Sequence, residues 1–186
     1  MRQLVALAAL FLVILVVGLL SYNIIGWTMP EASGTPTSSG DARVLVGAGD
    51  IATCPGEGDE ETAELLDEVV ADWPDAVVFT TGDNVYPGGA IEEYRECFEP
   101  TWGRHRARTR PAVGNHDFGE TKAAGYHEYW GERGGEFDQY YYSYDVGAWH
   151  IVVLNSECHR VGCDLDSPDG AQAEWLIEDL EASDAS

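Results

Sequence analysis

Three similar stretches of sequence decide the fold: VLVGAGDIA at residues 44–52, VVFTTGDNVY at residues 77–86 and RPAVGNHD at residues 110–117. The first two open on a short apolar run, which is typical of a buried strand, and the third opens on RPAV, a brief strand pattern. Each contains a glycine followed by an acidic or amide side chain. Asp50 and Asp83 are 33 residues apart, and Asp83 and Asn115 are 32 apart, about the length of one strand–helix unit. The pattern predicts an α/β domain whose three polar loops converge at the carboxyl ends of its strands.

Two helical patterns separate these stretches. Apolar residues recur at helical spacing over residues 59–73, which predicts an amphipathic helix whose acidic face is solvated. A shorter pattern from Ile91 to Phe98 predicts a second helix that ends before Pro100. Strands that alternate with helices favour a layered domain over an all-helical one.

The last part of the chain predicts a hairpin and one more helix. Residues 140–154 alternate in polarity and then become apolar, which is typical of two strands that turn at Val146-Gly147. Ser167-Pro168 opens a helix whose expected inner face is Trp175, Leu176 and Leu180. The fold class is therefore α/β, with a layered β-sheet core and flanking helices.

The first thirty residues have a different character. They carry a single charge, Arg2, and the segment from Leu4 to Leu20 is an unbroken apolar run. Continued to Trp27, this run is long enough to cross a hydrocarbon layer of roughly 30 Å as a helix. It is longer than the apolar centre of a secretory signal, so we favour an uncleaved anchor over a cleaved signal peptide. The predicted organisation is a transmembrane anchor or signal peptide at 1–30, a flexible linker at 31–42 and the main domain at 43–186, membrane-anchored or secreted outside the cytoplasm.

The charge balance excludes one class of partner. The 186 residues include 33 acidic and 10 basic side chains, which gives a formal net charge of −23 with a single lysine, Lys122. Such a surface repels phosphate backbones, so we expect no nucleic acid partner, whereas cations are attracted. The sequence leaves the oligomeric state open.

Four cysteines bear on the compartment. Cys158 and Cys163 close a short loop and are natural partners, which leaves Cys54 to pair with Cys97. Disulfides are expected outside the cytoplasm, and the alternative is four buried thiols. The spacing does not match the two close pairs of a structural zinc site.

The residues at the three strand ends indicate metal chemistry. Two carboxylates brought together repel each other unless a cation lies between them. Asp50, Asp83, Tyr86 and Asn115 offer hard oxygen ligands that suit Fe(III), Mn, Mg or Zn. Two such ions can hold a hydroxide nucleophile and bind a phosphoryl oxygen. The imidazole of His116 can stabilise the developing charge or protonate the leaving alkoxide.

GDIA, GDNVY and GNHD, in this order and spacing, resemble the calcineurin-like metallophosphoesterase superfamily, and the likeness runs from Val44 to about Ser183. Tyr86 makes the second motif similar to the purple acid phosphatase branch, in which a tyrosinate binds ferric iron. Ala52 stands where that branch usually has glycine. The resemblance implies hydrolysis of phosphate esters by a dinuclear centre with a metal-bound hydroxide, in which iron is paired with Fe, Zn or Mn.

The same resemblance assigns roles to single residues. Asp50, Asp83 and Tyr86 would hold the first metal ion. Asp83 would bridge to the second ion, which Asn115 would bind. His116 would be the acid or the transition-state stabiliser, and we expect Asp117 to orient its imidazole.

Two further motifs of the family, a lone histidine and Gly-His-x-His, complete its metal shells, and this sequence does not contain them. We therefore expect residues 43–186 to be the N-terminal portion of a longer domain, truncated at its C-terminus and weakly active alone. The alternative is a non-catalytic, membrane-anchored fragment of the same fold that binds cations or a partner.

Other polar residues have plainer interpretations. We expect His150 to pack in a strand rather than bind metal, and His105 to lie in a solvated loop. The arginines of residues 104–110 could guide a phosphate substrate, but pairing with surface acids is favoured. Tyr140–Tyr142 are expected to pack in a strand rather than form a substrate platform.

Overall fold

The computed structural model describes residues 43–119, 122–163 and 170–183. The chain divides into two units, Met1–Ser39 and Gly40–Ser186, and all described residues belong to the second. The predicted anchor or signal at 1–30 and the linker at 31–42 lie outside the described residues. Within the described ranges, no helix is both long and apolar enough to cross a membrane.

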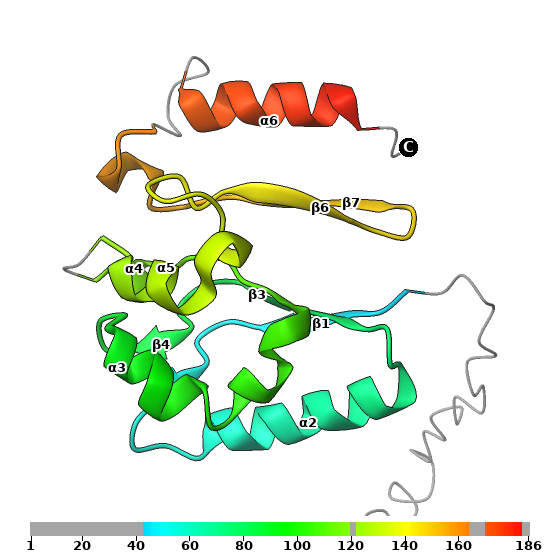
Figure 1. Ribbon diagram of the computed structural model, residues 1–186, viewed down its shortest axis with the longest axis vertical. Coiled ribbons are helices and arrows are strands. Elements are labelled where there is room, and N and C mark those ends of the chain that lie inside the picture. Colours follow the sequence, from blue (N-terminus) through cyan, green and yellow to red (C-terminus); the bar gives the residue numbers. More distant parts are fainter. Residues whose placement is uncertain (1–42, 120–121, 164–169, 184–186) are drawn as a thin grey trace, which may run out of the picture. The chain divides into compact units, whose positions relative to one another are not determined.

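A parallel sheet forms the centre of the domain (Figure 1). Its strands are β1 (Leu45–Ala48), β3 (Val77–Thr80) and β5 (Thr109–Arg110), in the order β1-β3-β5. All pairings are parallel, with Leu45 opposite Val77 and Phe79 opposite Arg110. This confirms the predicted α/β class, and the structure adds that the central strands are parallel. The third strand is shorter than the 110–113 run suggested, because Pro111 has no amide hydrogen for the ladder.

A second, very short sheet continues two of these strands past the sheet edge. Strand β2 (Ala52–Thr53) pairs in parallel with β4 (Val85–Tyr86). Since β2 follows Asp50 and β4 follows Asp83, the pairing keeps the first two polar loops side by side.

Helix α2 (Gly58–Asp72) covers one face of the central sheet (Figure 1). Ala63 and Leu66 are buried on its inner side, and the acidic residues of its outer face are exposed. The prediction of an amphipathic helix over 59–73 is therefore confirmed.

Aromatic side chains build much of the core around the next helices. Helix α3 (Ile91–Glu93) continues into a π-helical turn, η1 (Tyr94–Phe98). Together they form the helix that was predicted over Ile91–Phe98. The chain then forms η2 (Trp102–Arg108), α4 (Asn115–Phe118), α5 (Ala124–Trp130) and η3 (Gly131–Gly134). Phe98 packs edge-on against Tyr129 and Trp130, with ring centroids 5.8 and 5.4 Å away. Such pairs stabilise the core beyond the area that they bury.

A hairpin lies on the other side of the sheet, and the last helix packs against it (Figure 1). Strands β6 (Tyr142–Val146) and β7 (Trp149–Val153) are antiparallel and turn at Gly147, as predicted. After η4 (Cys158–Arg160) comes α6 (Ala171–Ala182). Asp179 of α6 accepts a hydrogen bond of 2.6 Å from Ser143 of β6. The Ser167-Pro168 start expected for this helix lies outside the described residues.

Two expectations about side chains were wrong, those for Leu180 and His105. Leu180 is 54% exposed, because the buried Gln172 turns the inner face toward Gln172, Trp175 and Leu176. The carbonyl oxygen of Gln172 accepts the Asn155 amide at 2.7 Å, which explains why a polar residue occupies this face. His105 is buried with its Nε2 atom 2.8 Å from Asp67, and is not solvated.

His150 lies in strand β7 with a largely buried side chain, as expected, but its partners are polar. Its Nδ1 atom lies 2.8 Å from Asp145, and its Nε2 atom lies 2.7 Å from Asp179. These hydrogen bonds raise the pKa of His150, that to Asp179 contributing most. The residue therefore links the hairpin to α6 through polar contacts.

Both predicted disulfides are present. Cys54 pairs with Cys97, and Cys158 pairs with Cys163, so that no cysteine of the chain is free. Two disulfides in one small domain are typical of proteins in an oxidising compartment.

Candidate metal centre

The first two polar loops run alongside each other at the backbone level. The amide of Asp50 donates to the carbonyl of Gly82 at 3.3 Å, and the amide of Ile51 donates to that of Asp83 at 3.0 Å. Asp50 and Asp83 both adopt left-handed backbone conformations, with φ of 54° and 52°. Such conformations are costly for residues other than glycine and often occur at functional sites. Two loops of the same shape thus present their aspartates side by side.

The third loop joins the second through a close approach at glycine. A side chain at Gly114 would overlap both the backbone and the carboxylate of Asp83. Only glycine permits this approach without displacing the aspartate. The Asp83 Oδ1 atom also accepts a hydrogen bond of 2.9 Å from the amide of His116.

The Tyr86 hydroxyl lies between the two aspartates. It donates a short hydrogen bond to Asp50 Oδ1 and lies 3.2 Å from Asp83 Oδ2. Asp50 is exposed, whereas Asp83 and Tyr86 are half-buried, so the cluster opens toward solvent. Two carboxylates and a phenol therefore meet around one accessible point.

The carboxylates of Asp50 and Asp83 explain why the Tyr86 phenol is protonated. The hydrogen bond to Asp50, partial burial and the Asp83 carboxylate together raise the pKa of the Tyr86 phenol well above its ordinary value. The phenol therefore keeps its proton, which separates the two negative charges. A cation among the same oxygen atoms would have the same effect.

Asn115 and His116 begin helix α4 beside this cluster. Asn115 is exposed, and His116 is half-buried. The His116 ring lies 4.3 Å from the Tyr86 ring, and its Nδ1 atom is 2.8 Å from the carbonyl oxygen of Pro87. A carbonyl only accepts hydrogen bonds, so Nδ1 carries a proton and Nε2 is the atom that can exchange one.

Asp117 has different partners from those that the sequence suggested. Its carboxylate is buried and accepts hydrogen bonds from the Tyr94 hydroxyl at 2.6 Å, the Gly114 amide at 2.9 Å and the Asn84 side chain at 2.9 Å. The His116 imidazole is not among its donors within the described residues. Burial raises the pKa of Asp117 to about 6, against the lowering effect of these hydrogen bonds. The carboxylate holds the second and third loops together, and the Pro87 carbonyl orients the imidazole.

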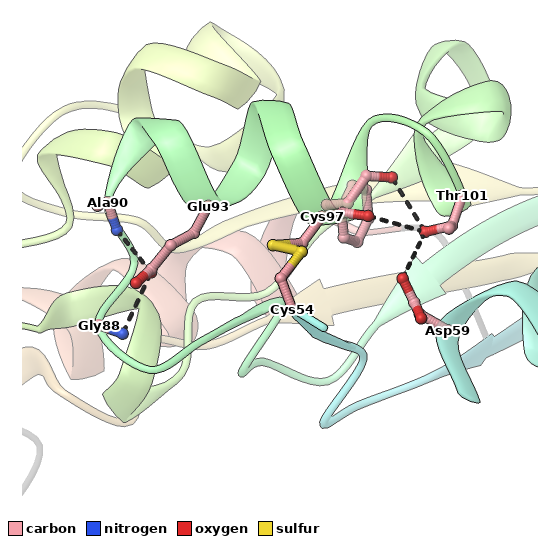
Figure 2. The surroundings of a disulfide bond; sticks show 8 residues. Cys54, Asp59, Gly88, Ala90, Glu93, Cys97 and Thr101 are labelled. Carbon is pink, nitrogen blue, oxygen red and sulfur yellow. Dashed lines mark hydrogen bonds between the residues drawn. A yellow bond between two sulfur atoms is a disulfide. The ribbon is translucent and has the colours of Figure 1, made fainter. Parts of the chain in front are cut away.

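A covalent link supports the outer side of these loops (Figure 2). The Cys54–Cys97 disulfide joins the segment after β2 to the π-helical turn η1. On the same helical segment, the Glu93 carboxylate accepts the amides of Gly88 and Ala90 at 3.2 and 3.0 Å. The α3–η1 segment therefore holds the loop after Tyr86 through Glu93 and the segment after β2 through the disulfide (Figure 2).

Sequence reasoning missed two residues of this arrangement, Asn84 and Tyr94. Asn84 is buried, and both its backbone and its side chain donate to Asp117. The sequence does place the amide side chain of Asn84 directly after Asp83. Asparagine is equally common in turns, so its position alone does not indicate a role in the site. Tyr94 gave no signal, because its contact with Asp117 depends on how η1 packs.

The oxygen atoms of this site fit a hard cation. Asp50, Asp83 and Tyr86 converge on one point, which is the donor chemistry that Fe(III), Mn or Mg prefers. Across residues 43–119, 122–163 and 170–183, no group of three or more His, Cys, Asp or Glu side chains is arranged to hold a metal ion. The convergent set thus depends on the phenol of Tyr86 as well as on two carboxylates.

Most arginines of the 104–110 segment are bound to the chain itself. Arg104 pairs with Glu60 at 2.8 Å and with Asp67 at 3.0 Å. Arg108 donates to the carbonyls of Pro74 and Ala76 at 2.7 and 3.0 Å. The expected pairing with surface acids is confirmed for Arg104, whereas Arg108 binds backbone carbonyls instead.

Open α/β proteins bind their ligands at the carboxyl edge of a parallel sheet, which is where the polar loops of this domain lie. Residues 45–178 match the calcineurin-like phosphoesterase family, and the chain belongs to that family. Searches among curated proteins and among solved structures each gave no match.

Proposed function

We propose that this protein hydrolyses phosphate esters with metal ions held at the candidate metal centre. Membership of the calcineurin-like phosphoesterase family supports metal-dependent phosphoester hydrolysis. The observation that carries the proposal is the Tyr86 hydroxyl, which contacts the carboxylates of both Asp50 and Asp83. Three hard oxygen donors from two adjacent strand ends are difficult to explain as turn capping alone.

The proposed ligand set follows the dinuclear scheme of the family. Asp50, Asp83 and Tyr86 would hold one ion, and Asp83 and Asn115 would hold a second. When bound, the ions would polarise a phosphoryl oxygen and lower the pKa of a coordinated water. The phenol of Tyr86 favours a ferric ion at the first position, as in purple acid phosphatases, with Fe, Zn or Mn at the second.

The chain's own residues would perform the remaining steps. His116 would hold a proton at Nε2 for the leaving alkoxide, since Nδ1 is engaged by Pro87. Asp117 would act through the backbone, by fixing Gly114 and Asn84 and so the positions of the ligand-bearing loops. We also propose export of the domain, with an anchor or a signal at residues 1–30, which the two disulfides support.

A second candidate is a non-catalytic domain that binds cations. It is favoured by the lack of an imidazole-containing ligand group among the described residues. Under this alternative, ions would bind reversibly at Asp50 and Asp83 without turnover. Weak metal binding by the chain alone, which we expect from the sequence, is compatible with both candidates.

The two candidates separate in one experiment on the full chain in detergent. Metal content and p-nitrophenyl phosphate turnover are measured after loading with Fe, Mn or Zn, for wild type, Asp83→Ala and Asp72→Asn. Phosphoester hydrolysis predicts metal-dependent turnover, however slow, that is lost with Asp83→Ala and kept with Asp72→Asn, an exposed carboxylate of α2. Metal uptake without any turnover would favour the non-catalytic candidate, and equal uptake by all three proteins would contradict both.

A further inference from the structure

A cleft of about 660 Å³ lies apart from the candidate metal centre, between β5, the α5–η3 segment and the hairpin. Its lining includes Arg110, Trp130, Glu132, Arg133, Tyr142 and Tyr144. None of the four proposed metal ligands contributes to it. The volume lies within the range of small-molecule binding sites in proteins.

Two cations in this cleft have no carboxylate partner. Arg43, Arg95, Arg104 and Arg160 each pair with a carboxylate. Within the described part of the chain, Arg106 and Arg108 donate to backbone carbonyls instead. Arg110 and Arg133 have no ion pair among the described residues, and both line the same cleft. Their charges are available to an anion.

Aromatic rings stand beside these cations. Tyr142 and Tyr144 project from alternate positions of β6 with ring centroids 6.1 Å apart and planes tilted by 29°. The Arg110 guanidinium lies 5.4 Å from the Tyr144 ring, and the Tyr142 hydroxyl donates to the Pro111 carbonyl at 2.8 Å. These contacts fix the rings along the strand as a surface on which a planar group can stack.

One polar atom of this aromatic surface lacks a partner. The hydroxyl of Tyr144 is buried and makes no hydrogen bond to any described residue. Buried hydroxyl groups nearly always have a partner, and an unpaired one costs free energy.

We propose that the cleft binds a small anion that carries a planar ring, an aryl phosphate or an aryl carboxylate. Arg110 and Arg133 bind the oxyanion, and the rings of Tyr142 and Tyr144 contact the planar group. Glu132 opposes the anion and limits the affinity. The site is independent of the metal centre, because none of its residues is a proposed metal ligand. It combines Arg110 and Tyr142, which belong to two segments that the proposed function leaves without a role.

Calorimetric titration of the full chain in detergent with phenyl phosphate and with benzoate tests the proposal. EDTA is present throughout, so that binding through metal ions does not contribute. We expect saturable binding of both probes, weakened about tenfold in Arg133→Gln and in Arg110→Gln, since a charge-assisted hydrogen bond is lost in each. Arg95→Gln, which removes an exposed arginine paired with Glu128, serves as the control and should change affinity less than about twofold.

Two further arms test charge and ring separately. Glu132→Gln should strengthen binding of both probes several-fold, because it removes the opposing charge. Inorganic phosphate and acetate, which lack the ring, should bind more weakly than the aryl probes. The proposal is overturned if neither aryl probe binds, if Arg133→Gln and Arg95→Gln bind equally well, or if the ring makes no difference. Arg133 is exposed, so its substitution leaves the fold intact and keeps the test decisive even if Arg110→Gln unfolds.

Discussion

The Asp83 carboxylate accepts a hydrogen bond of 2.9 Å from the backbone amide of His116, which joins the second polar loop to the third. The Asp83 side chain therefore has two roles that can be separated. Its Oδ1 atom accepts the hydrogen bond that holds His116, and its negative charge lies beside Asp50. Substitution by asparagine keeps the acceptor and removes the charge.

Asp83→Asn should leave the metal-free protein at least as stable as wild type, because it removes repulsion with the Asp50 carboxylate. Asp83→Ala should be less stable than Asp83→Asn by about 1 kcal/mol, the usual contribution of one hydrogen bond. Urea unfolding in EDTA measures both changes. If Asp83→Asn were clearly destabilised, the two carboxylates would not be in electrostatic conflict.

Tyr86→Phe tests the phenol as a ligand. In iron-loaded protein, wild type should show a visible tyrosinate-to-iron absorbance band, and Tyr86→Phe should lack it because no phenolate remains. Tyr144→Phe is a matched control, since the Tyr144 hydroxyl has no hydrogen-bond partner among the described residues. The same band in both variants would count against ligation by Tyr86.

Asp117→Ala should destabilise the protein by about 3 kcal/mol or more, because it leaves several buried donors without their charged acceptor. Tyr94→Phe removes only one of these donors, at 2.6 Å, and should cost about 1–2 kcal/mol. The double variant should be less destabilised than the sum of the two, because the residues are in direct contact. Additive losses would mean that the buried hydrogen bond contributes nothing.

The two disulfides should differ in their contribution to stability. Cys54 and Cys97 are 43 residues apart, whereas Cys158 and Cys163 are 5 apart. From loop-closure entropy, replacing the first pair by serine should cost about 4 kcal/mol and replacing the second about 2 kcal/mol. Thermal unfolding gives the order, and thiol titration of the unreduced protein should detect no free thiol. A larger loss for the short loop would contradict the entropic account.

The attachment of α6 to the hairpin should depend on pH. The carboxylates of Asp179 and Asp145 raise the pKa of His150, and the Ser143 hydroxyl shares Asp179. A raised histidine pKa contributes stability that is complete below the unfolded value of about 6.5 and is lost as pH rises through the folded value. His150→Gln should therefore destabilise the protein at pH 5.5 more than at pH 8.5. A loss that is the same at both pH values would exclude the charged form.

The sequence predicted the parts of the fold that depend on local pattern. Strands, the amphipathic helix, the hairpin turn at Gly147 and the order of the polar loops all follow from periodicity and turn chemistry. The meeting of Asp50 with Asp83 follows from parallel topology, which brings the carboxyl ends of neighbouring strands together.

What the sequence did not reveal depends on packing between distant segments. From the sequence, Asp117 could either orient the His116 imidazole or stabilise the polar loops. The hydrogen bond from Tyr94, a residue of another element, shows that its carboxylate is engaged in the core of the loops. Helical periodicity placed Leu180 inside, but the pairing of Gln172 with Asn155 rotates the helix away from that expectation. Burial of His105 and the polar contacts of His150 likewise require partners from other elements.

The most direct test of the candidate metal centre is a Mn²⁺ titration of the full chain, followed by the electron paramagnetic resonance signal of free Mn²⁺. We predict saturable Mn²⁺ binding by wild type and by Asp72→Asn, with uptake abolished in Asp83→Asn even though that protein remains folded. Undiminished Mn²⁺ uptake by folded Asp83→Asn would show that the cations bind elsewhere on the acidic surface, and would contradict the proposed centre.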